Sequence, residues 1–235
     1  MRYKNIVAAL SLTALITSEA ECTKKSEQKH NYFLKKDLDD CYNTSYKITT
    51  TVKLEKEVNG EDQKSWQGSG TLLQDSQTGN YYLLTAEHIT SDGTYKSKSG
   101  EVVKIIEEKS AVDNYEAKIF KESEEYDLAF FKLAGFTGKP FTGKIAAEIH
   151  PGNYVIGVGY PSGEKELFTT KVTDISRKST FLDIFIVGGN SGGGVYLIKD
   201  KEIQLCGVVT KTDSIPSLER LKIFFKDTPL EDEYL

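Results

Sequence analysis

Three short segments carry the side chains best suited to chemistry in this sequence. A histidine ends the segment Leu84–His88, Asp127 stands directly before an apolar run, and a serine lies among glycines in Gly189–Gly193. Acyl transfer needs a hydroxyl nucleophile, a neutral imidazole to take its proton and a buried carboxylate to fix the imidazole tautomer. It also needs two N–H groups aimed at the developing oxyanion, and glycines allow the tight turn that presents them. Together the segments supply the parts of a hydrolytic site.

Each segment also has an ordinary structural interpretation. A histidine at a strand end is commonly a satisfied polar residue, an aspartate before a strand is commonly a turn residue, and a glycine-rich loop with a serine is commonly only a turn. Their occurrence together in one chain favours the chemical interpretation.

The surrounding sequence predicts a fold made almost entirely of β-strands. Short runs rich in β-branched and aromatic residues alternate with turn residues, which is typical of a sandwich or of barrels. The one exception is Ser217–Lys226, which follows a proline and has the apolar spacing of a short helix. The expected strands are Tyr46–Lys56, Gly70–Leu73, Tyr81–Thr85, Val102–Glu107, Tyr115–Lys121, Leu128–Leu133, Tyr154–Val158, Leu167–Ile175, Thr180–Ile186, Val195–Ile198 and Ile203–Thr210.

Composition narrows the possible partners. The chain has 235 residues, of which 38% are hydrophobic and 28% charged, and its net charge is -5. Its lysines are scattered among acidic residues, which argues against a nucleic-acid partner because phosphate binding needs clustered cations. No cysteine has histidine or cysteine neighbours at zinc-ligand spacing, so we expect no metal and no cofactor.

The first twenty residues have the pattern of a signal peptide. Arg2 and Lys4 form a basic start, Ile6–Ile16 is a short apolar run, and Ser18 and Ala20 are small residues at the positions that a signal peptidase reads. The run is too short to span a bilayer. We therefore expect a secreted or periplasmic protein with no membrane contact beyond residues 1–20. Residues 21–44 are polar and lysine-rich, and we interpret them as an N-terminal extension.

In their order along the chain, these segments resemble the trypsin-like serine proteases, especially the bacterial HtrA-like and glutamyl-endopeptidase-like members. The family's Thr-Ala-x-His block resembles Thr85–His88, its Asp-Leu-Ala block resembles Asp127–Ala129, and its Gly-Asn-Ser-Gly-Gly block matches Gly189–Gly193. The resemblance implies two six-stranded antiparallel β-barrels over residues 45–235, with an active site between them. It also implies protein or peptide substrates.

The resemblance assigns roles to individual residues. His88 would be the general base, Asp127 its orienting partner and Ser191 the nucleophile, with the N–H groups of Gly189 and Ser191 as the oxyanion hole. The walls of the specificity pocket would come from Phe185, Ile186, Thr210 and Thr212. No acidic residue stands at the pocket base, so a buried Lys or Arg of a substrate would be unpaired. We expect cleavage after uncharged, mainly aliphatic residues, and Lys211 with the threonines makes an acidic residue the alternative.

The position next to the nucleophile bears on activation. Digestive members of the family have an aspartate there, which pairs with a new N-terminal amine after propeptide cleavage, whereas this chain has Asn190. We expect its oxyanion loop to be held by local hydrogen bonds, including one from the Asn190 amide. Residues 21–44 are then not an inhibitory propeptide.

Two other functions compete with this hypothesis. A Gly-x-Ser-x-Gly pattern also occurs in α/β-hydrolases, whose acid and histidine follow the serine in the chain. Here His30, His88 and His150 all precede Ser191, which excludes that class. The alternative from another class is a catalytically silent trypsin-fold binding protein, since fold alone does not guarantee activity. Intact triad residue types favour the enzyme.

Overall fold

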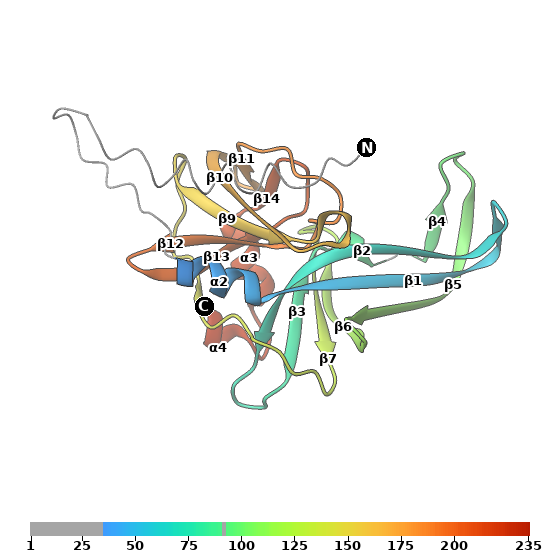
Figure 1. The fold of residues 1–235 in the computed structure, drawn as a ribbon, viewed down its shortest axis with the longest axis horizontal. Helices are drawn as coiled ribbons and strands as arrows, with labels where there is room; N and C mark the ends of the chain where they lie inside the picture. Colours follow the sequence, from blue (N-terminus) through green and yellow to red (C-terminus); the bar gives the residue numbers. More distant parts are fainter. Residues whose placement is uncertain (1–34, 91–92) are drawn as a thin grey trace. The chain divides into compact units, whose positions relative to one another are not determined.

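Strands β1 to β7 form a closed β-barrel with one additional strand. The computed structural model describes residues 35–90 and 93–235. The first sheet has the order β1-β2-β3-β7-β6-β5-β4, and pairing of β1 with β5 closes six of these strands into a barrel (Figure 1). The strands are β1 (Ser45–Val58), β2 (Glu61–Gln74), β3 (Tyr81–Thr85), β4 (Thr94–Lys96), β5 (Val102–Val112), β6 (Tyr115–Ser123) and β7 (Leu128–Leu133).

Strands β8 to β14 form a second sheet with the order β14-β11-β10-β9-β12-β13-β8. The expected all-β architecture of two barrels is confirmed, with three differences. Each sheet has seven strands, and within the described residues no pairing closes the second one. Its β13–β8 pair is parallel. The strands are β8 (Lys144–Ile145), β9 (Tyr154–Gly159), β10 (Glu166–Ile175), β11 (Ser179–Leu182), β12 (Gly194–Lys199), β13 (Glu202–Val208) and β14 (Ser214–Pro216).

Strand β7 lies between two parts of the core, which explains its nearly continuous apolar sequence. Phe131 belongs to the cluster inside the first barrel, with Ile48 and Leu83. Phe130 belongs to a second cluster that joins the two barrels and includes Val158 of β9. A strand that is buried on both faces is strongly fixed in register. The residue that precedes β7, Asp127, is therefore held at a defined place.

Three α-helices accompany the sheets in the described part of the chain: α2 (Lys35–Asn43), α3 (Leu218–Phe225) and α4 (Glu231–Tyr234). Helix α3 is the helix expected after Pro216, and its Phe224 stacks on Phe130 with ring centroids 4.9 Å apart. Helix α2 lies in the stretch expected to be an extension, and its Cys41 is a fully buried free thiol in the core that joins the barrels. Residues 1–34, with the expected signal peptide, lie outside the described residues. No helix in the described part of the chain is both long and apolar enough to cross a membrane.

The outer parts of β1, β2, β4 and β5 extend past the first barrel (Figure 1). A separate small cluster of Val52, Leu54, Val58 and Val103 fills this extension. Trp66 packs against both this cluster and the barrel core, and its Nε1 donates to the Ile89 carbonyl at 2.7 Å. The extension is thereby tied to the residue that follows His88.

Candidate active site

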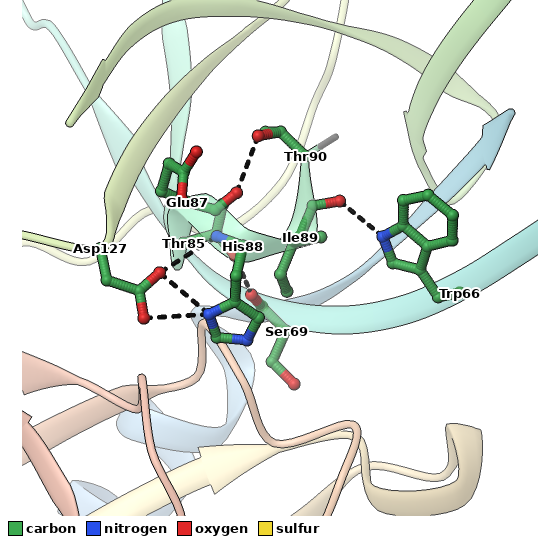
Figure 2. Close-up of polar contacts among 8 residues, drawn as sticks. All are labelled: Trp66, Ser69, Thr85, Glu87, His88, Ile89, Thr90 and Asp127. Atoms are coloured by element: carbon green, nitrogen blue, oxygen red, sulfur yellow. Dashed lines mark hydrogen bonds and ion pairs between the residues drawn. The ribbon is translucent and has the colours of Figure 1, made fainter. Parts of the chain in front are cut away.

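His88 and Asp127 meet at one edge of the first barrel. Strands β3 and β7 are antiparallel neighbours in which Thr85 pairs with Ala129. The chain leaves β3 at Thr85 and enters a short 3-10 helix, η1 (Glu87–Ile89), while Asp127 immediately precedes β7. The pairing therefore places both residues at the same end of adjacent strands. His88 Nδ1 lies 2.9 Å from Asp127 Oδ1 and 3.0 Å from Oδ2, and the His88 backbone N–H donates to Oδ1 at 3.0 Å (Figure 2).

This contact fixes the imidazole tautomer. A carboxylate only accepts hydrogen bonds, so Nδ1 carries the proton and Nε2 presents a lone pair. The hydrogen bond with Asp127 raises the pKa of His88 above its ordinary value; burial opposes that shift, and the charges of Asp127 and Glu87 add to it. The His88 side chain is 43% exposed, so it remains accessible to a substrate.

Asp127 is held in a backbone conformation that few side chains adopt. Its φ is 53°, in the left-handed region that Asp and Asn tolerate better than most residues. A turn supports it, since its N–H donates to the Glu124 carbonyl at 3.2 Å. In the same turn, Tyr126 lies under the guanidinium of Arg220, 5.3 Å from the ring centroid. Helix α3 thus braces the turn that presents the carboxylate.

The segment Gly189–Gly193 forms a tight turn whose polar groups divide into bonded and free ones. The Gly193 N–H donates to the Asn190 carbonyl at 2.8 Å, and the Gly192 N–H donates to the Val209 carbonyl at 2.7 Å. Among the described residues, the N–H groups of Gly189 and Ser191 donate to no protein acceptor. Gly189 has a φ of 91°, which a residue with a side chain rarely adopts. Two neighbouring donors are thus available to an external acceptor.

The turn packs directly against the segment that leads into His88. A Cβ on Gly192 would lie 2.0 Å from Thr85 Oγ1, 2.0 Å from the Ser69 carbonyl oxygen and 3.1 Å from the Ala86 nitrogen. Only a glycine allows this approach. Within the described part of the chain no hydrogen bond joins Ser191 Oγ to His88 Nε2. Catalytic hydrogen bonds often tighten only when substrate is bound.

The buried Asn190 side chain makes the local hydrogen bond expected of it. Its Nδ2 donates to the Val187 carbonyl at 3.3 Å. Its Oδ1 is buried without a partner, against Gly159, where a Cβ would approach that oxygen to 2.3 Å. No ion pair is needed for this turn to form.

The four residues expected to line a specificity pocket differ in exposure. Phe185 is 75% exposed, whereas Ile186 is buried in the core of the second sheet. Thr210 is half-buried and Thr212 exposed, and the Thr212 carbonyl accepts a hydrogen bond from the Ile186 N–H. Strand β11 ends at Leu182, so the strand expected over Thr180–Ile186 is too long.

The described residues contain no group of three or more His, Cys, Asp or Glu side chains able to hold a metal ion.

The geometry defines a protein of one closed β-barrel and a second, half-barrel sheet, with a histidine–carboxylate pair beside a glycine-rich turn. A comparison with protein families matches residues 68–208 to the trypsin-like peptidase domain. This match covers more than half of the chain, which therefore belongs to the trypsin-like peptidase family.

Solved structures share the fold. The active form of the Rv3671c protease from M. tuberculosis has a TM-score of 0.54 and 14% identity, covering 77% of this chain and 79% of its own. The serine endoprotease from Yersinia pestis has a TM-score of 0.54 and 17% identity, covering 83% of this chain and 66% of its own. A search of curated proteins finds no match. The protein is thus a peptidase by family, and at these identities the two neighbours support the fold.

Proposed function

We propose that this peptidase is a serine endopeptidase in which Ser191, His88 and Asp127 act as a triad. Ser191 Oγ attacks the carbonyl carbon of the scissile peptide bond, and its proton passes to His88 Nε2. The proton on Nδ1 stays in the hydrogen bond with Asp127, which stabilises the imidazolium. The N–H groups of Gly189 and Ser191 donate hydrogen bonds to the oxyanion of the tetrahedral intermediate.

The intermediate collapses with cleavage of the C–N bond. The leaving amine takes the proton from His88 Nε2, and the acyl group stays on Ser191 as an ester. Water then attacks this ester: it gives one proton to His88 and its oxygen to the acyl carbon. The ester C–O bond breaks, Ser191 Oγ recovers the proton, and the acid product leaves.

The observation that carries this proposal is the His88–Asp127 contact, with both carboxylate oxygens within 3.0 Å of Nδ1. It orients Nε2 as the free basic atom. The N–H groups of Gly189 and Ser191, which donate to no acceptor within the described residues, support the same assignment because they are free to donate to an oxyanion.

Two further proposals concern substrate and location. Phe185 is exposed just before the nucleophile turn and carries no charge, which favours uncharged, mainly aliphatic residues before the cut. Mass-spectrometric mapping of cleavage sites in a denatured proteome tests this, and a map dominated by Arg and Lys would contradict it. The sequence of residues 1–20 favours export, which makes the protein secreted or periplasmic.

The experiment for the central proposal is casein hydrolysis by purified wild-type protein and by Ser191→Ala. We expect hydrolysis by the wild type and loss of at least about 10³-fold in the variant. Hydrolysis by Ser191→Ala at the wild-type rate would refute the assignment of the nucleophile. Inactivity of both proteins, with wild-type melting behaviour, would favour the silent binding protein.

A further inference from the structure

Among the described residues, Ser69 of β2 is the one side chain of the first barrel that forms a hydrogen bond with the nucleophile turn. It is fully buried, and it lies in the segment Gly68–Leu73, whose weak resemblance to the family assigns it no role. Its Oγ donates to the Gly189 carbonyl at 2.7 Å and accepts from the Tyr160 N–H at 2.8 Å. A serine hydroxyl has one proton to donate, so its donor capacity is fully used. The side chain thus joins the turn to the end of β9.

The backbone of Ser69 also forms a hydrogen bond with this turn. Its N–H donates to the Ser191 carbonyl at 2.7 Å. Its own carbonyl accepts from Thr85 Oγ1 at 2.6 Å, a bond drawn in Figure 2. The residue therefore fixes the carbonyls of both residues whose N–H groups are free, Gly189 and Ser191.

Tyr160 completes this arrangement from the second sheet. Besides donating its N–H to Ser69, it places its carbonyl oxygen 2.4 Å from where a Cβ on Gly189 would stand. Gly189 is thus held on one side by a hydrogen bond and on the other by close backbone contact. The bond to the Gly189 carbonyl fixes the peptide plane after its Cα, and the close contact with Tyr160 restrains the Cα itself; together they limit the rotation of the preceding peptide, which carries the Gly189 N–H.

We infer that Ser69 is a positioning residue of the oxyanion hole: its hydroxyl holds the Gly189 carbonyl so that the N–H groups of Gly189 and Ser191 point at the reacting carbonyl. This inference rests on the proposed function. Ser69 is fully buried and, within the described residues, forms no hydrogen bond with His88, so it acts through the turn. Its effect falls on the transition state, in which the oxyanion develops, and not on substrate binding.

The test compares Ser69→Ala with Ser110→Ala as a matched control. Ser110 is a buried serine of β5 whose hydroxyl bonds Thr50 Oγ1 at 2.9 Å, so its loss removes an equivalent hydrogen bond away from the turn. For Ser69→Ala we expect kcat to fall about 10- to 100-fold, less than the ~10²–10³ lost when an oxyanion donor is removed outright. KM should change less than about twofold, because ground-state contacts are kept.

Two readouts separate positioning from general destabilisation. The affinity for a peptide boronic acid, whose tetrahedral adduct occupies the oxyanion hole, should fall in Ser69→Ala and not in Ser110→Ala. The pH midpoint of kcat/KM should stay at the wild-type value, because Ser69 does not touch the His88–Asp127 pair. If Ser69→Ala does not fold, Ser69→Cys keeps a weak donor of similar size and should show the same changes to a smaller degree.

Three results would overturn the inference: a kcat within about twofold of wild type in the Ser69 variant, an equal loss in Ser110→Ala, or a shifted pH midpoint. Each leaves the proposed function intact as long as the wild-type protein turns over substrate. A wild-type protein with no turnover and no boronate affinity would instead refute the proposed function, and this inference with it.

Discussion

Replacing Asp127 by asparagine tests the assigned roles with almost no change in shape. The asparagine Oδ1 can still accept from the His88 backbone N–H, as the carboxylate does at 3.0 Å. Its NH₂ group, however, would face Nδ1 in place of the second carboxylate oxygen, which lies 3.0 Å away. Because an amide nitrogen only donates, Nδ1 must then accept and the ring proton moves to Nε2. Protonated Nε2 cannot take the proton from Ser191.

The expected loss follows from this tautomer change. In proteases with this triad it costs about 10⁴ in kcat, which corresponds to about 5.5 kcal/mol of transition-state stabilisation. The free energy of unfolding should fall by only about 1 kcal/mol, since one charged hydrogen bond is lost at a partly exposed site.

The pH dependence gives a second measure. The pKa of His88 is raised mainly by its hydrogen bond with Asp127, so the pair stabilises the fold below about pH 6.5 and that contribution is lost as pH rises through the raised pKa. Activity requires the neutral base and runs in the opposite direction, with an acid limb above about pH 6.5 in the wild type. Asp127→Asn should move that limb down.

The assay measures kcat and KM for a peptide substrate from pH 5 to 9, with melting curves for both proteins. A folded Asp127→Asn protein that keeps its kcat within about tenfold of wild type would refute the assigned role of Asp127.

Three further predictions address the surroundings of the site. Glu87→Gln should lower the pKa of His88, because the Glu87 charge helps to raise it, and a pH–rate profile whose acid limb stays or moves up would contradict this. Gly192→Ala should reduce kcat/KM by more than about 100-fold, since its Cβ would lie 2.0 Å from a backbone oxygen and the turn must shift. The control for backbone strain alone is Gly60→Ala, because Gly60 has a φ of 78° and nothing within 4 Å of a Cβ. Equal activity of the two variants would refute the argument. Lys165→Met should lower the free energy of unfolding by about 1–3 kcal/mol in urea titrations, because the ammonium lies 4.7, 5.4 and 5.5 Å from three tyrosine ring centroids and donates to a carbonyl at 3.0 Å, and unchanged stability would contradict it.

The buried strands beside the site could be predicted closely from the sequence. The expected Tyr81–Thr85 and Leu128–Leu133 coincide with β3 and β7, because burial demands continuous apolar residues there. The first half of β2 was missed, since its side chains are polar and largely exposed and therefore show no apolar pattern. Helix α2 was missed for a related reason: it is mostly charged, and Leu38 and Cys41 alone join it to the core cluster between the barrels.

The residues of the candidate site also fall into those that the sequence indicates and those that it does not. His88, Asp127 and the glycine-rich turn stand in recognisable blocks, so a resemblance could point to them, and the His88–Asp127 contact lies where those blocks imply. Ser69 lies in the segment Gly68–Leu73, which resembles the family only weakly and assigns it no role, because its role depends on a hydroxyl meeting two backbone groups more than ninety residues away in the chain. The end of β11 at Leu182 was missed because the following apolar residues leave the sheet to build the loop before Ser191.

The most direct test of the central claim is the site of covalent labelling by a fluorophosphonate. The reagent reacts with a serine only where a base activates its hydroxyl, and peptide mapping by mass spectrometry identifies the labelled residue. We expect one adduct per chain, located on Ser191, and none in Ser191→Ala. A folded wild-type protein that takes up no label, or that carries it on another residue, would contradict the account.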